Sequence, residues 1–161
     1  MRAKRAKIFD FRISDFEFLL MSLPVERQQA IRQTLEAIHD PQERLMVDTS
    51  WKTTLNPLRA EDRIDSNLVR GCVSRVWLAA ALEGGRCYFR IDADSILVRG
   101  LVRLLCGIYD GATPDEIIAE EPAVLEELGI LRNLSPTRQN GLASLRRTLV
   151  DFAAKSSSSL S

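Results

Sequence analysis

The chain has little of what most metal sites and many hydrolases require. Its 161 residues include one histidine, His39, and three cysteines. A Cys–His hydrolase or a histidine-based metal site would depend on that single histidine, so both classes are disfavoured. Lys plus Arg and Asp plus Glu balance at 22 each. This balance lacks the basic excess of a general nucleic-acid-binding protein.

Long hydrophobic stretches are also missing. No apolar run approaches the roughly 18 residues that a membrane-spanning helix needs. The basic residues 1–7 are not followed by the apolar core of a signal peptide, because acidic and basic side chains interrupt residues 10–17. We therefore expect a cytoplasmic protein that has neither a membrane nor a nucleic acid as its partner.

The three cysteines, at 72, 87 and 106, are widely spaced. No two of them have the short separation typical of zinc ligands, and an odd number fits free thiols in a reducing compartment better than a disulfide framework. Cys87 alternates with polar residues in a predicted strand, and Cys106 lies in a strongly apolar helical segment. Both are therefore predicted to be small core residues.

Hydrophobic periodicity predicts helices, then a β-hairpin, then helices, an order typical of an α+β fold. The expected structure is a small antiparallel sheet packed against helices. Asp40 and Asp94 are predicted to cap the helices that follow them, and Thr113 to open a capping box. The predicted helices span 24–38, 41–51, 95–110 and 122–129, with a further helix opening at the capping box of Thr113. The last predicted helix begins at Ser135-Pro136 and has Leu142, Leu145, Leu149 and Phe152 as its core stripe; the predicted strands are 73–82 and 86–92.

The domain organisation follows from the same pattern. Residues 21–155 are expected to form one domain, since a chain of this size buries enough surface to fold alone. Residues 1–20 are interpreted as an N-terminal extension. The serine-rich segment 156–161 is expected to be a disordered tail.

Cys72 differs from the other two cysteines. It follows Gly71 directly and lies between Arg70 and Arg75, where a polar loop leads into an apolar strand. Flanking positive charge favours the thiolate, which is the nucleophilic form of the side chain. From spacing and composition alone, Cys72 is either a reactive thiol placed by a turn or a small packed residue.

Charge alone would add little to the reactivity of this thiol. Lowering a thiol pKa from about 8.5 to about 7 raises the thiolate fraction near pH 7.5 some seven- or eightfold. The same shift lowers intrinsic nucleophilicity about fivefold, so the net gain is under about twofold. Positioning by a docked partner can contribute far more, and a site of this kind should depend on it.

The chain contains four motifs in order: VRGCVSRVWL at 69–78, the acidic turn and helix at 92–101, GATPDEI at 111–117 and LSPTRQNGL at 134–142. Their order is that of the SufE family of cysteine desulfuration proteins, which residues 24–155 resemble. The first motif resembles the family's acceptor-cysteine motif and follows the Glu61-Asp62-Arg63 triplet at the family's distance. One departure is Asn133, where the family usually has histidine.

The resemblance implies a SufE/NifU-like α+β fold and a function in sulfur transfer. Cys72 would accept a persulfide sulfur from a pyridoxal-phosphate cysteine desulfurase, stimulate its turnover, and pass sulfur on to an iron–sulfur scaffold complex. The protein would need no cofactor of its own. The residues expected to support the site or contact the partner are Gly71, Ser74, Arg70, Asp94 and Arg138.

Two other functions are considered. An iron–sulfur cluster scaffold of related fold would need three converging cysteines, and Cys87 and Cys106 are expected to be buried. A thiol hydrolase built on Cys72 would need a general base, and no histidine lies at a plausible position. Arg70 and Arg75 could also be no more than solvated charges beside a strand.

Overall fold

The computed structural model describes residues 23–46 and 56–160. Helices α2 (Pro24–Leu35) and α3 (Pro41–Met46) precede the strands β1 (Asn56–Pro57), β2 (Val76–Glu83) and β3 (Arg86–Ala93). The 3-10 turns η2 (Ala60–Asp62) and η3 (Asp65–Asn67) lie between β1 and β2. Helices α4 (Ile96–Tyr109), α5 (Pro114–Ala119), α6 (Val124–Glu127) and α7 (Pro136–Leu160) follow, with the turn η4 (Leu131–Asn133) before α7.

The sheet contains the predicted antiparallel hairpin of β2 and β3, paired from Val76–Ala93 to Glu83–Arg86. A third strand, β1, was not predicted. It runs parallel to β3 on the side away from β2, so the sheet is mixed, in the order β1-β3-β2. Two residues that include Pro57 carry no strand pattern, so only the tertiary pairing reveals β1. The α+β class is confirmed.

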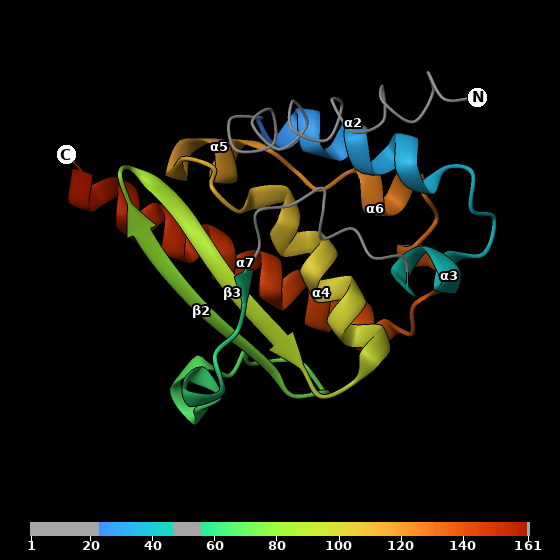
Figure 1. Cartoon of the computed structure of the whole chain (residues 1–161), viewed down its shortest axis with the longest axis horizontal. Coiled ribbons are helices and arrows are strands. Elements are labelled where there is room, and N and C mark those ends of the chain that lie inside the picture. The colour runs from blue at the N-terminus through green and yellow to red at the C-terminus, as the bar shows by residue number, and fades with distance from the viewer. Residues whose placement is uncertain (1–22, 47–55, 161) are drawn as a thin grey trace, which may run out of the picture.

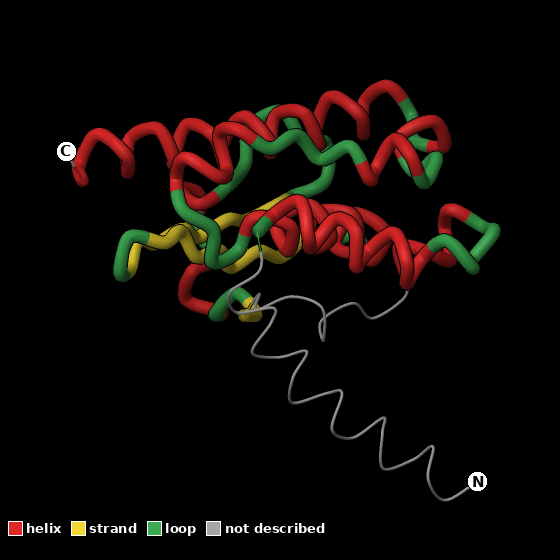
Figure 2. Tube along the Cα trace, turned by 90° about the horizontal axis from the view of Figure 1, so that it is seen from above, coloured by secondary structure: helices red, strands yellow, loops and turns green. Residues whose placement is uncertain are grey.

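The core lies between one face of the sheet and the helices, and α7 passes behind the hairpin and α4 (Figure 1). The view from above shows α7 as a separate layer beside the strands and α4 (Figure 2). Phe89 of β3 and Phe152 of α7 meet edge to face, with ring centroids 6.0 Å apart. The predicted stripe on α7 is buried at Leu142, Leu145 and Leu149. Each fully buried leucine contributes about 1.5–3 kcal/mol to stability.

Two of the three predicted caps are confirmed. Thr113 forms the capping box of α5, with its N–H donating to Glu116 Oε2 at 2.8 Å. Asp40 accepts a bond from the Gln42 N–H at 2.8 Å, at the start of α3. The prediction for Asp94 is wrong, because Ser95 is the N-cap residue of α4 and no side chain caps this helix.

The C-terminal segment is helical rather than disordered up to Leu160, contrary to the expectation. Ala153 and Ser156 are buried, so the last turns of α7 pack against the rest of the protein. The hydroxyls of Ser158 and Ser159 donate to carbonyl oxygens four residues earlier. Tertiary packing at Ala153 and Ser156 outweighs the weak helix propensity of serine.

Some expectations concern residues outside the described part of the chain. These are the N-terminal extension, residues 1–20, and the end of the helix predicted to reach Trp51. The first predicted helix is shorter than expected, since α2 ends at Leu35. Among the helices of residues 23–46 and 56–160, none is both long and apolar enough to cross a membrane.

Candidate functional site around Cys72

Cys72 lies on a closed loop, residues 70–75, referred to below as the Cys72 loop. The two ends of this loop are tied together, because the Val69 N–H donates to the Val76 carbonyl at 2.8 Å. One step further out, Leu68 and Trp77 form an antiparallel bridge. A loop with paired ends presents its tip in a defined place. Cys72 is therefore held by a loop that closes at the start of β2. The strand begins at Val76 and not at Val73, so the predicted strand start is wrong and Val73 belongs to the loop.

Two glycines allow the Cys72 loop to contact α7. Gly71 has φ of +87°, a left-handed conformation that other residues adopt at a cost, and a Cβ there would lie 2.6 Å from Ser144 Oγ. Gly141 is within α7, and a Cβ on it would lie 3.3 Å from Cys72 Sγ. Sequence reasoning included Gly141 only as part of a motif. Its missing side chain makes room for the sulfur.

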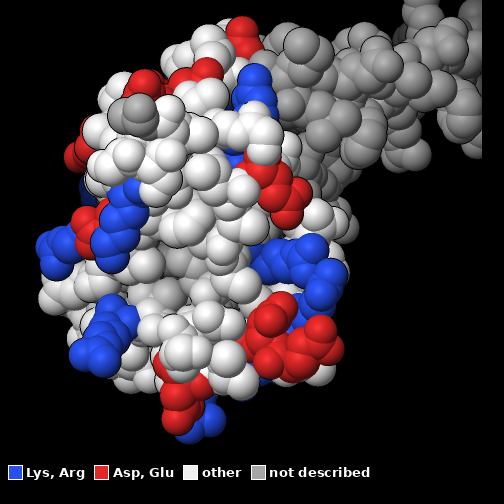
Figure 3. Space-filling view, turned by 90° about the vertical axis from the view of Figure 1, so that its left-hand side faces the viewer, with Lys and Arg blue, Asp and Glu red and all other residues white. Residues whose placement is uncertain are grey.

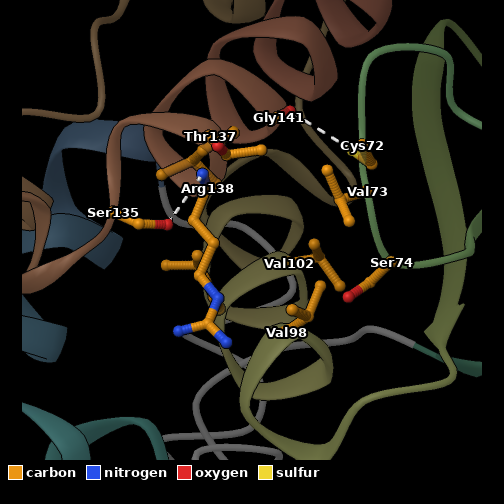
Figure 4. A pocket seen from close by; sticks show the side chains of 11 residues that line it. Cys72, Val73, Ser74, Val98, Val102, Ser135, Thr137, Arg138 and Gly141 are labelled. Atoms are coloured by element: carbon orange, nitrogen blue, oxygen red, sulfur yellow. Dashed lines mark hydrogen bonds between the residues drawn. The ribbon is translucent and has the colours of Figure 1, made fainter.

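A pocket of about 330 Å³ opens beside Cys72. Cys72 and its neighbours form one wall, the first turns of α7 form the opposite wall, and α4 forms the floor (Figure 4). The floor is apolar, the α7 wall includes Ser135 and Thr137, and Arg138 extends along the rim (Figure 4). The lining residues are Cys72, Val73, Ser74, Val98, Leu101, Val102, Ser135, Thr137, Arg138, Gly141 and Leu142.

The resting state of Cys72 is the thiol. Its Sγ is half-buried and donates to the Gly141 carbonyl oxygen at 3.5 Å. Burial raises the pKa of Cys72 above its ordinary value, because the charged thiolate loses solvation. The expectation that flanking arginines favour the thiolate is wrong for this state. Arg70 and Arg75 are both exposed, so water screens their charges.

The other two cysteines are buried, as predicted, with relative exposures of 0%. Burial raises the pKa of Cys87 to about 11. The pKa of Cys106 is also raised well above its usual range, by burial and by the nearby Asp110 carboxylate. Both thiols are therefore protonated and inaccessible. Within the described ranges, no three His, Cys, Asp or Glu side chains gather into a group that could hold a metal ion.

A buried carboxylate that the sequence analysis did not single out supports the Cys72 loop. Asp92 accepts a bond from Arg99 Nε at 2.6 Å and forms a second ion pair with Arg63. The Arg63 guanidinium also lies over the Trp77 ring, 5.7 Å from its centroid. Asp92 thus joins the end of β3, the start of α4 and the segment before the loop. The alternation of β3 placed Asp92 on the polar face, so its burial was not visible in the sequence.

The remaining predicted residues lie around the site in different ways. Arg138 and Ser74 line the pocket, whereas Arg70 is exposed and does not line it. Asp94 is exposed, and its backbone N–H donates to the Arg75 carbonyl at 3.1 Å. Asp94 therefore fixes the end of the Cys72 loop through its backbone, leaving its carboxylate in solvent.

The pocket has an unusual exposed neighbour. Val73, directly after Cys72, has 84% of its surface exposed. Arg138 makes no ion pair with any residue in the described ranges and is likewise exposed. The rim of the pocket therefore carries an exposed apolar side chain and an exposed guanidinium.

Comparison with known proteins identifies related chains. Residues 29–153 match the SufE family, described as an Fe–S metabolism associated domain. An uncharacterized SufE-like protein of Synechocystis is 38% identical over 106 residues, which are 66% of this chain and 67% of that protein. The SufE-like protein 1, chloroplastic/mitochondrial, of Arabidopsis thaliana is 30% identical over 128 residues, or 79% of this chain. This chain spans about a third (34%) of the plant protein's length.

A solved structure shares the fold. The solution structure of a hypothetical protein from Thermus thermophilus superimposes with a TM-score of 0.56, at 20% identity. The match covers 80% of this chain and 96% of that one. The family match extends over the Cys72 loop, the pocket and most of α7. The chain belongs to the SufE family, and this membership supports a role in sulfur transfer for Fe–S metabolism.

Proposed function

We propose that the protein accepts sulfur from a pyridoxal-phosphate cysteine desulfurase, stimulates that enzyme, and passes the sulfur on for iron–sulfur cluster assembly. The observation that carries the proposal is the position of Cys72. It is the one half-buried cysteine among three in the described residues, it lies on a loop with tied ends, and it borders a pocket. It also occupies the acceptor position of the motif that resembles the family's.

The transfer step needs no net oxidation or reduction. The Cys72 thiol loses its proton to solvent, and the thiolate attacks the terminal sulfur of the partner's cysteine persulfide. A new S–S bond forms at Cys72 while the old one breaks. The partner's cysteine leaves as a thiolate and takes up a proton. Because only sulfur and a proton move, the protein needs no cofactor of its own.

Partner docking has to activate Cys72, since the free protein holds it as a thiol against Gly141. Loop movement that takes Sγ away from this carbonyl would restore its solvation and lower its pKa. The exposed Val73 at the loop tip offers a partner an apolar contact. The Arg138 guanidinium beside the pocket would then attract the negative charge of a persulfide that turns inward.

The pocket also suits storage of the transferred sulfur. Its floor is formed by the apolar side chains of Val98, Leu101 and Val102 of α4, which would bind water and polar oxidants poorly. A persulfide held there would be shielded from oxidation to sulfenic and higher acids. The pocket therefore supports acceptance followed by delayed delivery.

The test is intact-protein mass spectrometry after anaerobic incubation with a purified cysteine desulfurase and L-cysteine. Wild type should gain the mass of sulfur, peptide mapping should place it on Cys72, and Cys72→Ser should gain none. Formation of the desulfurase's own persulfide is the positive control. Equal sulfur on Cys72→Ser, or none on wild type while the desulfurase is loaded, would reject the proposal.

A further inference from the structure

The edge of the sheet at β2 is open over part of its length. β2 lies at the end of the order β1-β3-β2, so only one of its sides pairs with another strand of the described sheet. The bond from the Asp94 N–H to the Arg75 carbonyl fixes the alternation along the antiparallel pair. Odd-numbered residues of β2 bond to β3. Even-numbered residues direct their N–H and C=O groups away from the sheet.

The first half of this outward edge is already covered. The Val76 carbonyl accepts the bond from Val69 that closes the Cys72 loop, and the bridge between Leu68 and Trp77 continues the cover. Beyond the bridge, the outward N–H and C=O groups of Ala80 and Leu82 have no partner among the described residues. Residues 79–83 are referred to below as the β2 edge.

The β2 edge has few of the features by which proteins usually protect a sheet edge. Charged side chains, proline and short strands prevent edges from pairing with other chains. The opposite strand, β1, has two of these features, since it is two residues long and contains Pro57. β2 has eight residues, and from Val76 to Leu82 none is charged or proline. Figure 3 shows the molecule from the left-hand side of Figure 1, and on this face charged groups surround a mostly uncharged middle.

We propose that the β2 edge pairs with the β2 edge of a second copy of this chain, forming one continuous sheet across a two-fold axis. With Ala81 on the axis, Ala80 of each copy lies opposite Leu82 of the other, and the two residues exchange both N–H···O bonds. All outward N–H and C=O groups of Ala80 and Leu82 then find partners. The pairing ends at Gly84, because the first copy turns away from the sheet there. Opposite this turn, the Leu68–Trp77 bridge begins to cover the edge of the second copy.

Small side chains allow the two strands to approach each other in this register. On one face of the sheet, Ala81 lies opposite the Ala81 of the second copy. On the other face, half-buried Leu82 packs against Ala80, which is exposed in the single chain. The contact is self-complementary, as a two-fold interface requires.

Charge complementarity favours the same register. Glu83 lies opposite Ala79 of the second copy, and Ala79 is itself paired with Arg90 of β3. With strands about 4.8 Å apart, the backbones of Glu83 and the second copy's Arg90 are about 10 Å apart, so their long side chains can meet over the alanine. Neither residue forms an ion pair within the described chain. A pocket of about 440 Å³ lined by Ala79, Glu83 and Arg90 leaves room for the contact.

The first experiment is sedimentation velocity over a range of protein concentrations, combined with amide hydrogen exchange. We expect a reversible dimer, with exchange at Ala80 and Leu82 slowing as concentration rises. Ala79 and Ala81 are internal controls, because their N–H groups bond to β3 in the monomer and should be protected at every concentration. A protein that stays monomeric up to about millimolar concentration, well above the Kd of a weak specific dimer, would overturn the proposal. Concentration-independent protection of Ala80 and Leu82 would also overturn it, since another segment of the same chain would then cover the edge.

Substitutions in the β2 edge test whether this edge forms the dimer contact. Ala80→Pro removes an N–H that points away from β3, so the sheet should survive while the dimer is lost. Glu83→Lys should weaken the dimer about tenfold by placing like charges together at two symmetric positions. Arg90→Glu should do the same, and the double exchange Arg90→Glu with Glu83→Lys should restore affinity. Glu126→Lys on α6 is the matched control and should leave the dimer unchanged.

The charge exchange decides the outcome if Ala80→Pro fails to fold. A dimer that none of the β2 edge variants weakens, or that the double exchange does not rescue, would show that the copies meet through a different surface. Neither result depends on sulfur transfer, so the proposal stands or fails separately from the proposed function.

Discussion

Cys72 Sγ lies 3.5 Å from the carbonyl oxygen of Gly141, a residue 69 positions later in the chain. The contact joins the tip of a loop to a helix. It exists because Gly141 has no side chain, and it keeps the sulfur protonated and half-buried. The resting geometry thus protects Cys72, and docking has to release it.

Gly141→Ala should displace the Cys72 thiol. The new Cβ would lie 3.3 Å from Sγ, closer than most side-chain contacts, so the sulfur has to move away from α7 by a few tenths of an ångström. We expect alkylation of Cys72 by iodoacetamide to accelerate severalfold. The gain of about 1 kcal/mol that alanine normally brings to a helix should be largely cancelled by this crowding. Asn140→Ala, at the exposed neighbouring position, is the control. An unchanged alkylation rate with a full gain in stability would contradict the contact.

The pH dependence of alkylation reports the state of Cys72 in the free protein. Burial raises its pKa, so the thiolate fraction and the alkylation rate should have a midpoint above the ordinary thiol pKa of about 8.5. Binding of a desulfurase that moves the loop outward should shift this midpoint down. Because the charged form is disfavoured in the folded state, Cys72 should also make the fold less stable as pH rises above the unfolded thiol pKa.

The other cysteines provide the control for this titration. Cys87 and Cys106 are fully buried and should not react below about pH 9 in the folded protein. Cys72→Ser should therefore show no alkylation until denaturant is added, when the two remaining thiols should react. A midpoint at or below the ordinary thiol value in the free protein would mean that the flanking arginines outweigh burial.

Asp92→Asn should destabilise the region behind the Cys72 loop. The substitution removes the charge that faces both Arg63 and Arg99 and weakens the bonds to them. Both arginines are partly exposed, so we expect a loss of about 1–3 kcal/mol in the free energy of unfolding, measured by urea denaturation. Asp94→Asn should change stability by less than about 0.5 kcal/mol, because that carboxylate is in solvent. Equal effects of the two substitutions would be inconsistent with a supporting role for Asp92.

Arg138→Glu should slow desulfurase-dependent sulfur loading of Cys72. Reversing the charge at the pocket rim is expected to reduce the rate on the order of tenfold at low salt, with a smaller effect as salt screens the charge. Arg147→Glu changes an exposed arginine of the same helix that does not line the pocket, and should alter the rate less than about twofold. Equal slowing by both variants would assign the effect to net charge instead of position.

Most helices and strands were predicted correctly because the interactions that form them are between residues close in the sequence. The apolar period of α4, the hairpin alternation and the capping box at Thr113 each depend on residues within one helix or one strand pair. The errors concern longer-range effects. Pro57 entered a strand through pairing with β3, and Ser156 became helical through burial.

The sequence by itself determined the α+β class, the motif order that resembles the SufE family, and which of the three cysteines is placed by a turn. These depend on composition, periodicity and the spacing of neighbours. Only the tertiary structure decided that Cys72 rests as a thiol against Gly141, that the Asp92 carboxylate rather than the Asp94 carboxylate forms the ion pairs behind the loop, and that β2 has an open edge. Solvation and pairing depend on segments distant in the chain, and no local pattern encodes which of them meet.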